Sequence, residues 1–103
     1  MRISEAQHKA YRLHNRICAQ NNQTWPPVVT VVDILEEAGE VADAVKNLEG
    51  YSPHQQPYGK EKLAVELADL TWSVLVLAAT YSLDMEKAVE DMLKDYEKRF
   101  IRS

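Results

Sequence analysis

The side chains best suited to chemistry are carboxylates that occur in two pairs. Glu37 and Glu40 form the first pair, and Glu66 and Asp69 form the second. Side chains three positions apart lie on the same face of a helix. The second pair interrupts an otherwise apolar stretch, and a helix that is apolar almost all round is usually buried. Because buried carboxylates are destabilising unless a positive charge or a shared proton compensates them, something must offset these charges.

A divalent metal ion is the simplest way to offset them. If the helices that carry the two pairs pack antiparallel, the pairs can face each other, with Glu36 beside the first. Several carboxylates in one pocket do not all ionise without a counter-charge, and Mg²⁺ or Mn²⁺ prefers carboxylate oxygen. No Cys or His lies near either pair, which disfavours zinc, and neither pair has the Glu-x-x-His pattern of ferritin-type di-iron sites. Mg²⁺ held by carboxylates typically binds substrate phosphates, so the pattern points to phosphate-ester or pyrophosphate chemistry.

Helices with short links must position these groups. Apolar residues at helical spacing predict helices over residues 4–21, 28–48 and 62–82, and a fourth that follows a cap at Asp84. We therefore expect an all-α, four-helix bundle in a single domain that spans residues 1–103. The third helix is apolar over more of its girth than three partners in one chain can easily cover. The bundle is therefore expected to be completed by oligomerisation.

The acidic residues of the second helix have a simpler explanation when they are taken alone. Five acids between Asp33 and Asp43 fall in one arc, and such a stripe is usually the solvent-facing side of an amphipathic helix. Two details weaken this explanation. The five acids repel one another without any Lys or Arg before Lys46, and Gly39 sits within the helix at a cost of about 1 kcal/mol relative to Ala. A glycine within a helix often marks the close approach of another backbone or a ligand.

Two loops carry further candidates. Trp25, in a short polar loop, either plugs the end of the bundle or forms a platform for a planar ligand. The longer loop, residues 49–59, is either a lid over a site or a plain connection. His54 is the only group in that loop that titrates near neutral pH, and we expect it to be structural.

The composition argues against several classes of partner. The net charge of −4 and the pI of about 5.3 disfavour a general binder of nucleic-acid polymers. Cys18 is the only cysteine, so no intrachain disulfide framework exists and a reducing, cytoplasmic location is expected. The amino terminus has no apolar signal-peptide region, and Glu66 and Asp69 leave the third helix too short an apolar run to span a bilayer. No membrane partner is therefore expected.

The two acidic motifs, taken together, are similar to those of a known family. The segment Leu35–Ala44 reads LEEAGEVADA, and the segment Glu66–Asp69 reads ELAD. In this order and on such helices they resemble the E-E-x-x-E … E-x-x-D signature of the MazG-type nucleoside triphosphate pyrophosphohydrolases, of the all-α NTP pyrophosphatase superfamily. The resemblance runs from about Val28 to Phe100.

This resemblance implies roles for individual residues. Glu36 would be the base or would orient the attacking water, a role that Glu37 could also take. Four residues would be Mg²⁺ ligands: Glu37, Glu40, Glu66 and Asp69. Family members cleave an NTP or dNTP to the monophosphate and pyrophosphate, often to clear unwanted nucleotides, and are usually dimers or tetramers with shared sites. A homodimer or homotetramer with a nucleoside triphosphate substrate is therefore expected, and Trp25 is the candidate for stacking on the base.

The last helix departs from the family pattern. MazG-type proteins often carry an Asn and a Lys there to hold the phosphates, and Leu93 and Asp95 occupy those positions in this chain. Three cations nearby remain available to steady the phosphates: Lys94, Lys98 and Arg99. The departure favours an alternative function, a non-catalytic metal- or nucleotide-binding helical interaction module. A plain structural bundle with an acidic solvent-facing stripe is a third and weaker possibility.

Overall fold

Four helices and no strands make up residues 1–102, the part of the chain that the structure, a computed structural model, describes. In chain order the helices are α1 (Ile3–Gln20), α2 (Pro27–Leu48), α3 (Lys60–Thr80) and α4 (Met85–Phe100). The expected all-α class is confirmed, and the helix ends lie within two residues of the predicted ones.

Local sequence signals account for the helix ends. Pro27 opens α2, where its missing N–H group leaves no hydrogen bond unmade. Gly50 follows α2 with a positive φ of 81°, a conformation that glycine adopts without strain. Asp84 caps α4, as predicted, because its side chain accepts a hydrogen bond from the backbone N–H of Lys87 at 3.0 Å.

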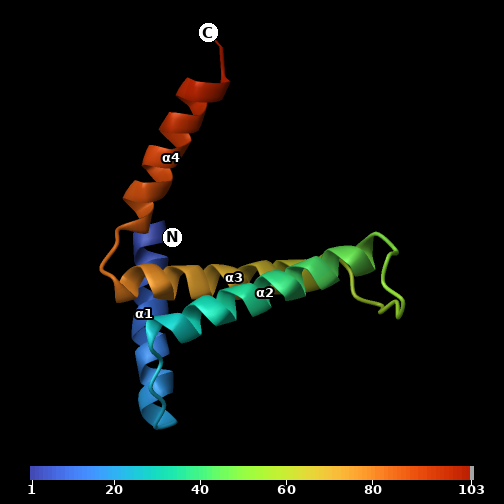
Figure 1. Cartoon of the computed structure of the whole chain (residues 1–103), viewed down its shortest axis with the longest axis horizontal. Coiled ribbons are helices and arrows are strands. Elements are labelled where there is room, and N and C mark those ends of the chain that lie inside the picture. Colours follow the sequence, from blue (N-terminus) through green and yellow to red (C-terminus); the bar gives the residue numbers. More distant parts are fainter. Residues whose placement is uncertain (103) are drawn as a thin grey trace.

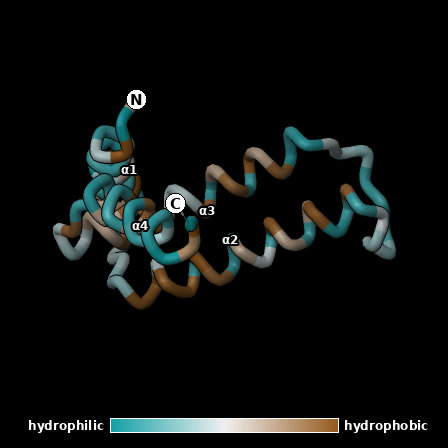
Figure 2. Tube along the Cα trace, turned by 90° about the horizontal axis from the view of Figure 1, so that it is seen from above, coloured by the Kyte–Doolittle hydropathy of each residue, from teal (hydrophilic) through white to brown (hydrophobic). Residues whose placement is uncertain are grey.

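An antiparallel hairpin of α2 and α3 forms the centre of the structure (Figure 1). The loop of residues 49–59 joins the two helices at one end, and α1 packs across α3 near the other end. Hydrophobic residues gather along the part of the hairpin that lies nearest α1 (Figure 2). Because the two helices pack antiparallel, the acidic face of α2 lies opposite the largely apolar face of α3 that carries Glu66.

The core is small, and the other helices of the chain cover only part of the apolar surface of α3. The fully buried hydrophobic residues are mostly small ones: Ala10, Ala44, Val76 and Ala78. Val65 and Leu67 of α3, which the sequence predicts to be buried, are 54% and 45% exposed. Since α1 and α2 are the main packing partners of α3, one side of that helix remains uncovered in a single chain.

α4 projects away from the hairpin, so the four helices do not close into a bundle within one chain (Figure 1). No residue of α4 is buried, and several of its apolar residues are at least 42% exposed: Met92, Leu93, Tyr96 and Phe100. The N-terminal end of α4 is fixed to α1 by Gln7. The amide of Gln7 donates to the carbonyl of Leu83 at 2.6 Å and accepts from the N–H of Met85 at 3.2 Å. These bonds tie the start of α4 to α1.

α3 is also the one helix of the described chain that is long and apolar enough to cross a membrane. The same length and composition occur in core helices of soluble proteins, so the property alone is weak evidence. In this structure α3 contacts α1 and α2 and carries the buried carboxylate Glu66.

Candidate metal centre

Three carboxylates meet between α2 and α3, near the middle of the hairpin. Glu37 and Glu40 come from α2 and Glu66 comes from α3, and one oxygen from each lies within 4.8 Å of the others. The spacing of three residues puts Glu37 and Glu40 on the face of α2 that packs against α3. These three residues, hereafter the carboxylate cluster, are three of the four metal ligands predicted from the sequence.

Two oxygens of the cluster lack any hydrogen-bond donor. Glu66 is only 4% exposed, and its Oε2 atom is buried without a partner. Oε2 of Glu37 is likewise buried and unpartnered. Buried polar atoms are nearly always paired in folded proteins, so two orphaned carboxylate oxygens in one cluster need an explanation. A hard divalent cation fits this set of donors, because Mg²⁺ and Mn²⁺ prefer carboxylate oxygen.

The carboxyl groups shift one another's protonation. A hydrogen bond with Glu66, together with the charges of Glu37 and Glu66, raises the pKa of Glu40 to about 7. Burial, with smaller contributions from Asp69, Asp33 and Glu66, raises the pKa of Glu37. By contrast, hydrogen bonds from Lys62 and with Glu40 lower the pKa of Glu66. Near neutral pH and without a cation, a proton is therefore held more readily by Glu40 than by Glu66.

Lys62 supplies the positive charge next to the cluster. Its Nζ atom lies 2.7 Å from Oε1 of Glu66, one helical turn further along α3. The Lys62 side chain is 44% exposed, whereas the Glu66 side chain is 5% exposed. The spacing of four residues on one helix is the sequence signal for this pair, which is absent from the predicted site.

Two further acids flank the cluster. Asp69, the fourth predicted ligand, is exposed and lies outside the group of three, although it is near enough to raise the pKa of Glu37. Asp33 accepts a hydrogen bond of 3.0 Å from the buried hydroxyl of Ser73. Glu36, the candidate base, is exposed on α2.

The predicted substrate-binding residues lie away from the cluster within this chain. Lys94, Lys98 and Arg99 are exposed on α4, a helix that has no extensive contact with α2 or α3. Trp25 lies just before the first residue of α2 and packs edge-on against His14, with ring centroids 5.8 Å apart. A single chain therefore does not bring these four residues to the carboxylates.

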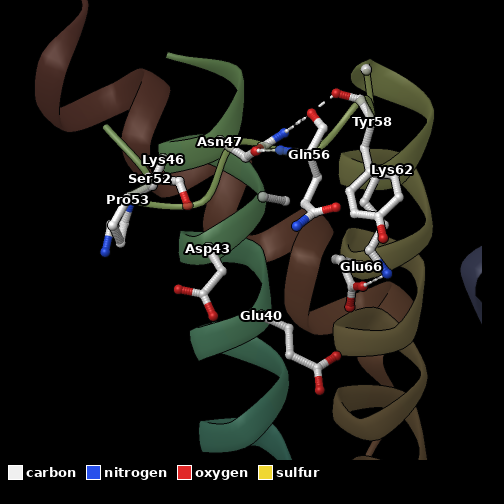
Figure 3. Close-up of a pocket in the computed structure, with 12 residues that line it drawn as sticks. Glu40, Asp43, Lys46, Asn47, Ser52, Pro53, Gln56, Tyr58, Lys62 and Glu66 are labelled. Carbon is white, nitrogen blue, oxygen red and sulfur yellow. Dashed lines mark hydrogen bonds and ion pairs between the residues drawn. The ribbon is translucent and has the colours of Figure 1, made fainter. Parts of the chain in front are cut away.

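A pocket of about 530 Å³ adjoins the cluster at the loop end of the hairpin (Figure 3). Glu40, Glu66 and Lys62 line the end of the pocket where the cluster lies. Loop 49–59 forms the opposite wall and contributes further lining residues: Ser52, Pro53, Gln56 and Tyr58. A volume between roughly 300 and 1,000 Å³ is usual for sites that bind small ligands.

Asn47 holds this loop in place. Its side-chain oxygen accepts from the backbone N–H of Gln56 at 2.7 Å, and its amide donates to the carbonyls of Gln56 and Tyr58 at 3.2 and 3.4 Å. The loop that the sequence leaves as either a lid or a connection is therefore tied back to α2 as a wall of the pocket. His54 is exposed and does not line it.

Comparison with protein families gives one match. The model of the MazG nucleotide pyrophosphohydrolase domain matches residues 28–100, which cover α2, α3 and α4. No curated protein and no solved structure matches the chain significantly. The matched segment contains both acidic motifs and the whole carboxylate cluster.

Proposed function

The chain belongs to the MazG nucleotide pyrophosphohydrolase family, and on this premise we propose that it is a Mg²⁺-dependent nucleoside triphosphate pyrophosphohydrolase. The reaction splits an NTP or dNTP into the monophosphate and pyrophosphate by attack of water at the α–β linkage. Clearing unwanted nucleotides from the cytoplasm is the corresponding role in the cell.

The observation that carries the proposal is the pair of buried, unpartnered oxygens in the carboxylate cluster. Glu37, Glu40 and Glu66 would hold Mg²⁺, with Mn²⁺ as a substitute, and Asp69 would complete the set from the next turn of α3. A bound Mg²⁺ supplies Lewis-acid chemistry, because it offsets the charge of a phosphate chain and acidifies water. Three carboxylates are suited to holding such an ion while leaving room for phosphate oxygens.

Glu36 and Glu37 are the candidates for the base. Glu37 has an oxygen free of hydrogen-bond donors, and its raised pKa brings it closer to the pH at which a general base works best. Glu36 is the neighbouring carboxylate on the exposed side, where it can orient a water molecule. The base accepts the proton of the attacking water as the new bond to phosphorus forms.

A second copy of the chain would complete the contacts to the phosphates and the nucleobase of the substrate. The apolar residues left exposed on α3 and α4 support a homodimer or homotetramer. In such an assembly, Lys94, Lys98 and Arg99 would steady the phosphates of the neighbouring site, and Trp25 would stack on the base. Neither a nucleic-acid polymer nor a membrane is required as a partner.

Pyrophosphate release tests the proposal. Canonical and modified NTPs and dNTPs are incubated with the wild type, with Mg²⁺ or with EDTA, and with Glu40→Gln. We expect Mg²⁺-dependent release that falls at least about 100-fold in Glu40→Gln, since charged groups that position a reaction are worth about 3 kcal/mol or more. Glu90→Gln, a change of equal charge on exposed α4, is the control and should retain activity. Release that persists in EDTA, or survives Glu40→Gln, contradicts the proposal.

A non-catalytic metal- or nucleotide-binding module is the second candidate. Leu93 and Asp95 stand where phosphate-binding residues are expected, and the cations of α4 lie away from the cluster in a single chain. The same experiment separates the two functions. Tight binding of Mg²⁺ with no release from any nucleotide would favour the module.

A further inference from the structure

Among residues 1–102, Lys62 is the only Lys or Arg that forms an ion pair with the carboxylate cluster. We propose that Lys62 is an exchangeable counter-ion. It neutralises Glu66 while the site lacks a divalent cation, and it binds the phosphate chain of the substrate once a cation occupies the cluster. This inference rests on the proposed function, because it assigns a substrate contact within the same site.

The position of Lys62 allows both contacts. Its ammonium lies 2.7 Å from Glu66, yet the side chain is 44% exposed and lines the pocket beside the cluster. The four-carbon stem of lysine can swing without any change in the backbone. In the same position, Nζ lies 5.7 Å from the ring centroid of Tyr58, close enough for a cation–π contact that does not depend on Glu66. Figure 3 shows Lys62 between Tyr58 and Glu66.

Charge gives the reason for the exchange. A divalent cation held by Glu66 and an ammonium paired with the same carboxylate repel each other, and the repulsion is strong where water is largely excluded. The cation has the advantage, because it can draw on Glu37 and Glu40 as well, whereas Lys62 is paired with Glu66 alone. The side chain that can move is therefore Lys62.

A phosphate chain is the anion that Lys62 would meet. The substrate reaches the cluster through its phosphates, and the cations of α4 do not lie near the cluster within the chain. Lys46 also lines the pocket, so the space beside Lys62 has a second positive charge at its edge. Lys62 thereby supplies, from α3 of the same chain, part of the phosphate contact that Leu93 and Asp95 cannot provide on α4.

Opposite effects on two ligands test this inference. Mg²⁺ alone, and inorganic pyrophosphate at saturating Mg²⁺, are titrated calorimetrically into wild type, Lys62→Met and the control Lys60→Met. In Lys62→Met we expect Mg²⁺ to bind about fivefold more tightly, because a competing ion pair of about 1 kcal/mol is gone. Pyrophosphate should bind at least about tenfold more weakly, because a charge-assisted hydrogen bond is lost. Lys62→Arg should keep most of the pyrophosphate affinity, and Lys60→Met, an exposed change that does not touch the pocket, should match the wild type.

Each other result overturns the inference. Unchanged or weaker Mg²⁺ binding in Lys62→Met would mean that Lys62 only orients Glu66, and unchanged pyrophosphate binding would mean that it does not meet the substrate. Lys62→Gln, which keeps a polar side chain, repeats the test if Lys62→Met lacks the circular dichroism of the wild type. Failure of the proposed function is distinguishable, because the wild type itself would then release no pyrophosphate from nucleotides.

Discussion

The affinity of the site for Mg²⁺ should depend steeply on pH between pH 6 and pH 8. The cause is the proton of Glu40, whose pKa is raised to about 7 by its interaction with Glu66 and by the charges of Glu37 and Glu66. A cation and this proton compete for the same oxygens, so the proton must leave when the metal binds. An isolated carboxyl of ordinary pKa 4.5 is already ionised throughout this range and would give a flat profile.

The size of the effect follows from that pKa. Roughly one tenth of the sites are deprotonated at pH 6 and roughly nine tenths at pH 8, so the apparent affinity should rise about ninefold. At pH 7, binding of one ion should release about half a proton per site. The affinity for Mg²⁺ rises with pH because the pKa of Glu40 is raised. Below this pKa the metal-free site keeps its proton and binds Mg²⁺ more weakly.

Isothermal titration calorimetry measures both quantities. Mg²⁺ is titrated at pH 6, 7 and 8, and at pH 7 in two buffers with different enthalpies of ionisation, which gives the number of protons released. Glu40→Gln should bind more weakly and lose the pH dependence, whereas Glu90→Gln should keep it. An affinity that changes less than about twofold in the wild type, with no proton release at pH 7, would refute the raised pKa of Glu40.

Three further predictions concern the surroundings of the site. Ser73→Ala removes the donor to Asp33 and should lower the free energy of unfolding in urea by about 1 kcal/mol, whereas Ser82→Ala, at an exposed position, should change it little. Gly39→Ala should raise that free energy by about 0.5–1 kcal/mol, because an added Cβ meets no atom within 4 Å; a loss of stability would mean that another molecule packs there. Asn47→Ala should speed amide hydrogen exchange in loop 49–59 about tenfold, because the bonds that tie the loop to α2 are lost, and unchanged exchange would show that the loop is held by other contacts.

The helices and the carboxylate cluster could be predicted because their signals are local. Apolar periodicity, Pro27 and Asp84 determine helix ends through contacts within a few residues. The spacing of Glu37 and Glu40 places them on one face of α2. Because α2 and α3 are consecutive helices that pack antiparallel, that face can meet Glu66 of α3.

The placement of α4 relative to the hairpin could not be predicted from the sequence, because the contacts that fix it are not local. The start of α4 is tied to α1 by Gln7, 76 residues before Leu83 in the sequence, which bonds to both Leu83 and Met85. Nothing in the amphipathic pattern of α4 distinguishes a helix packed on its own hairpin from one that projects. No atom of the same chain lies within 4 Å of a Cβ added at Gly39, so the close approach of another backbone or a ligand stays a prediction.

The two halves of the proposed site therefore depend on different parts of the structure. The metal-binding half is set by α2 and α3, which pack against each other and place two unpartnered oxygens together in a single chain. The α4 cations of the proposed phosphate-binding half lie on a helix with no buried residue, so under the proposal another copy of the chain would bring those charges to the carboxylates. Because Lys62 is attached to the metal-binding half, it is the phosphate contact that would survive in an isolated chain. A monomeric variant should thus keep Mg²⁺ binding and weak pyrophosphate binding, and lose most turnover.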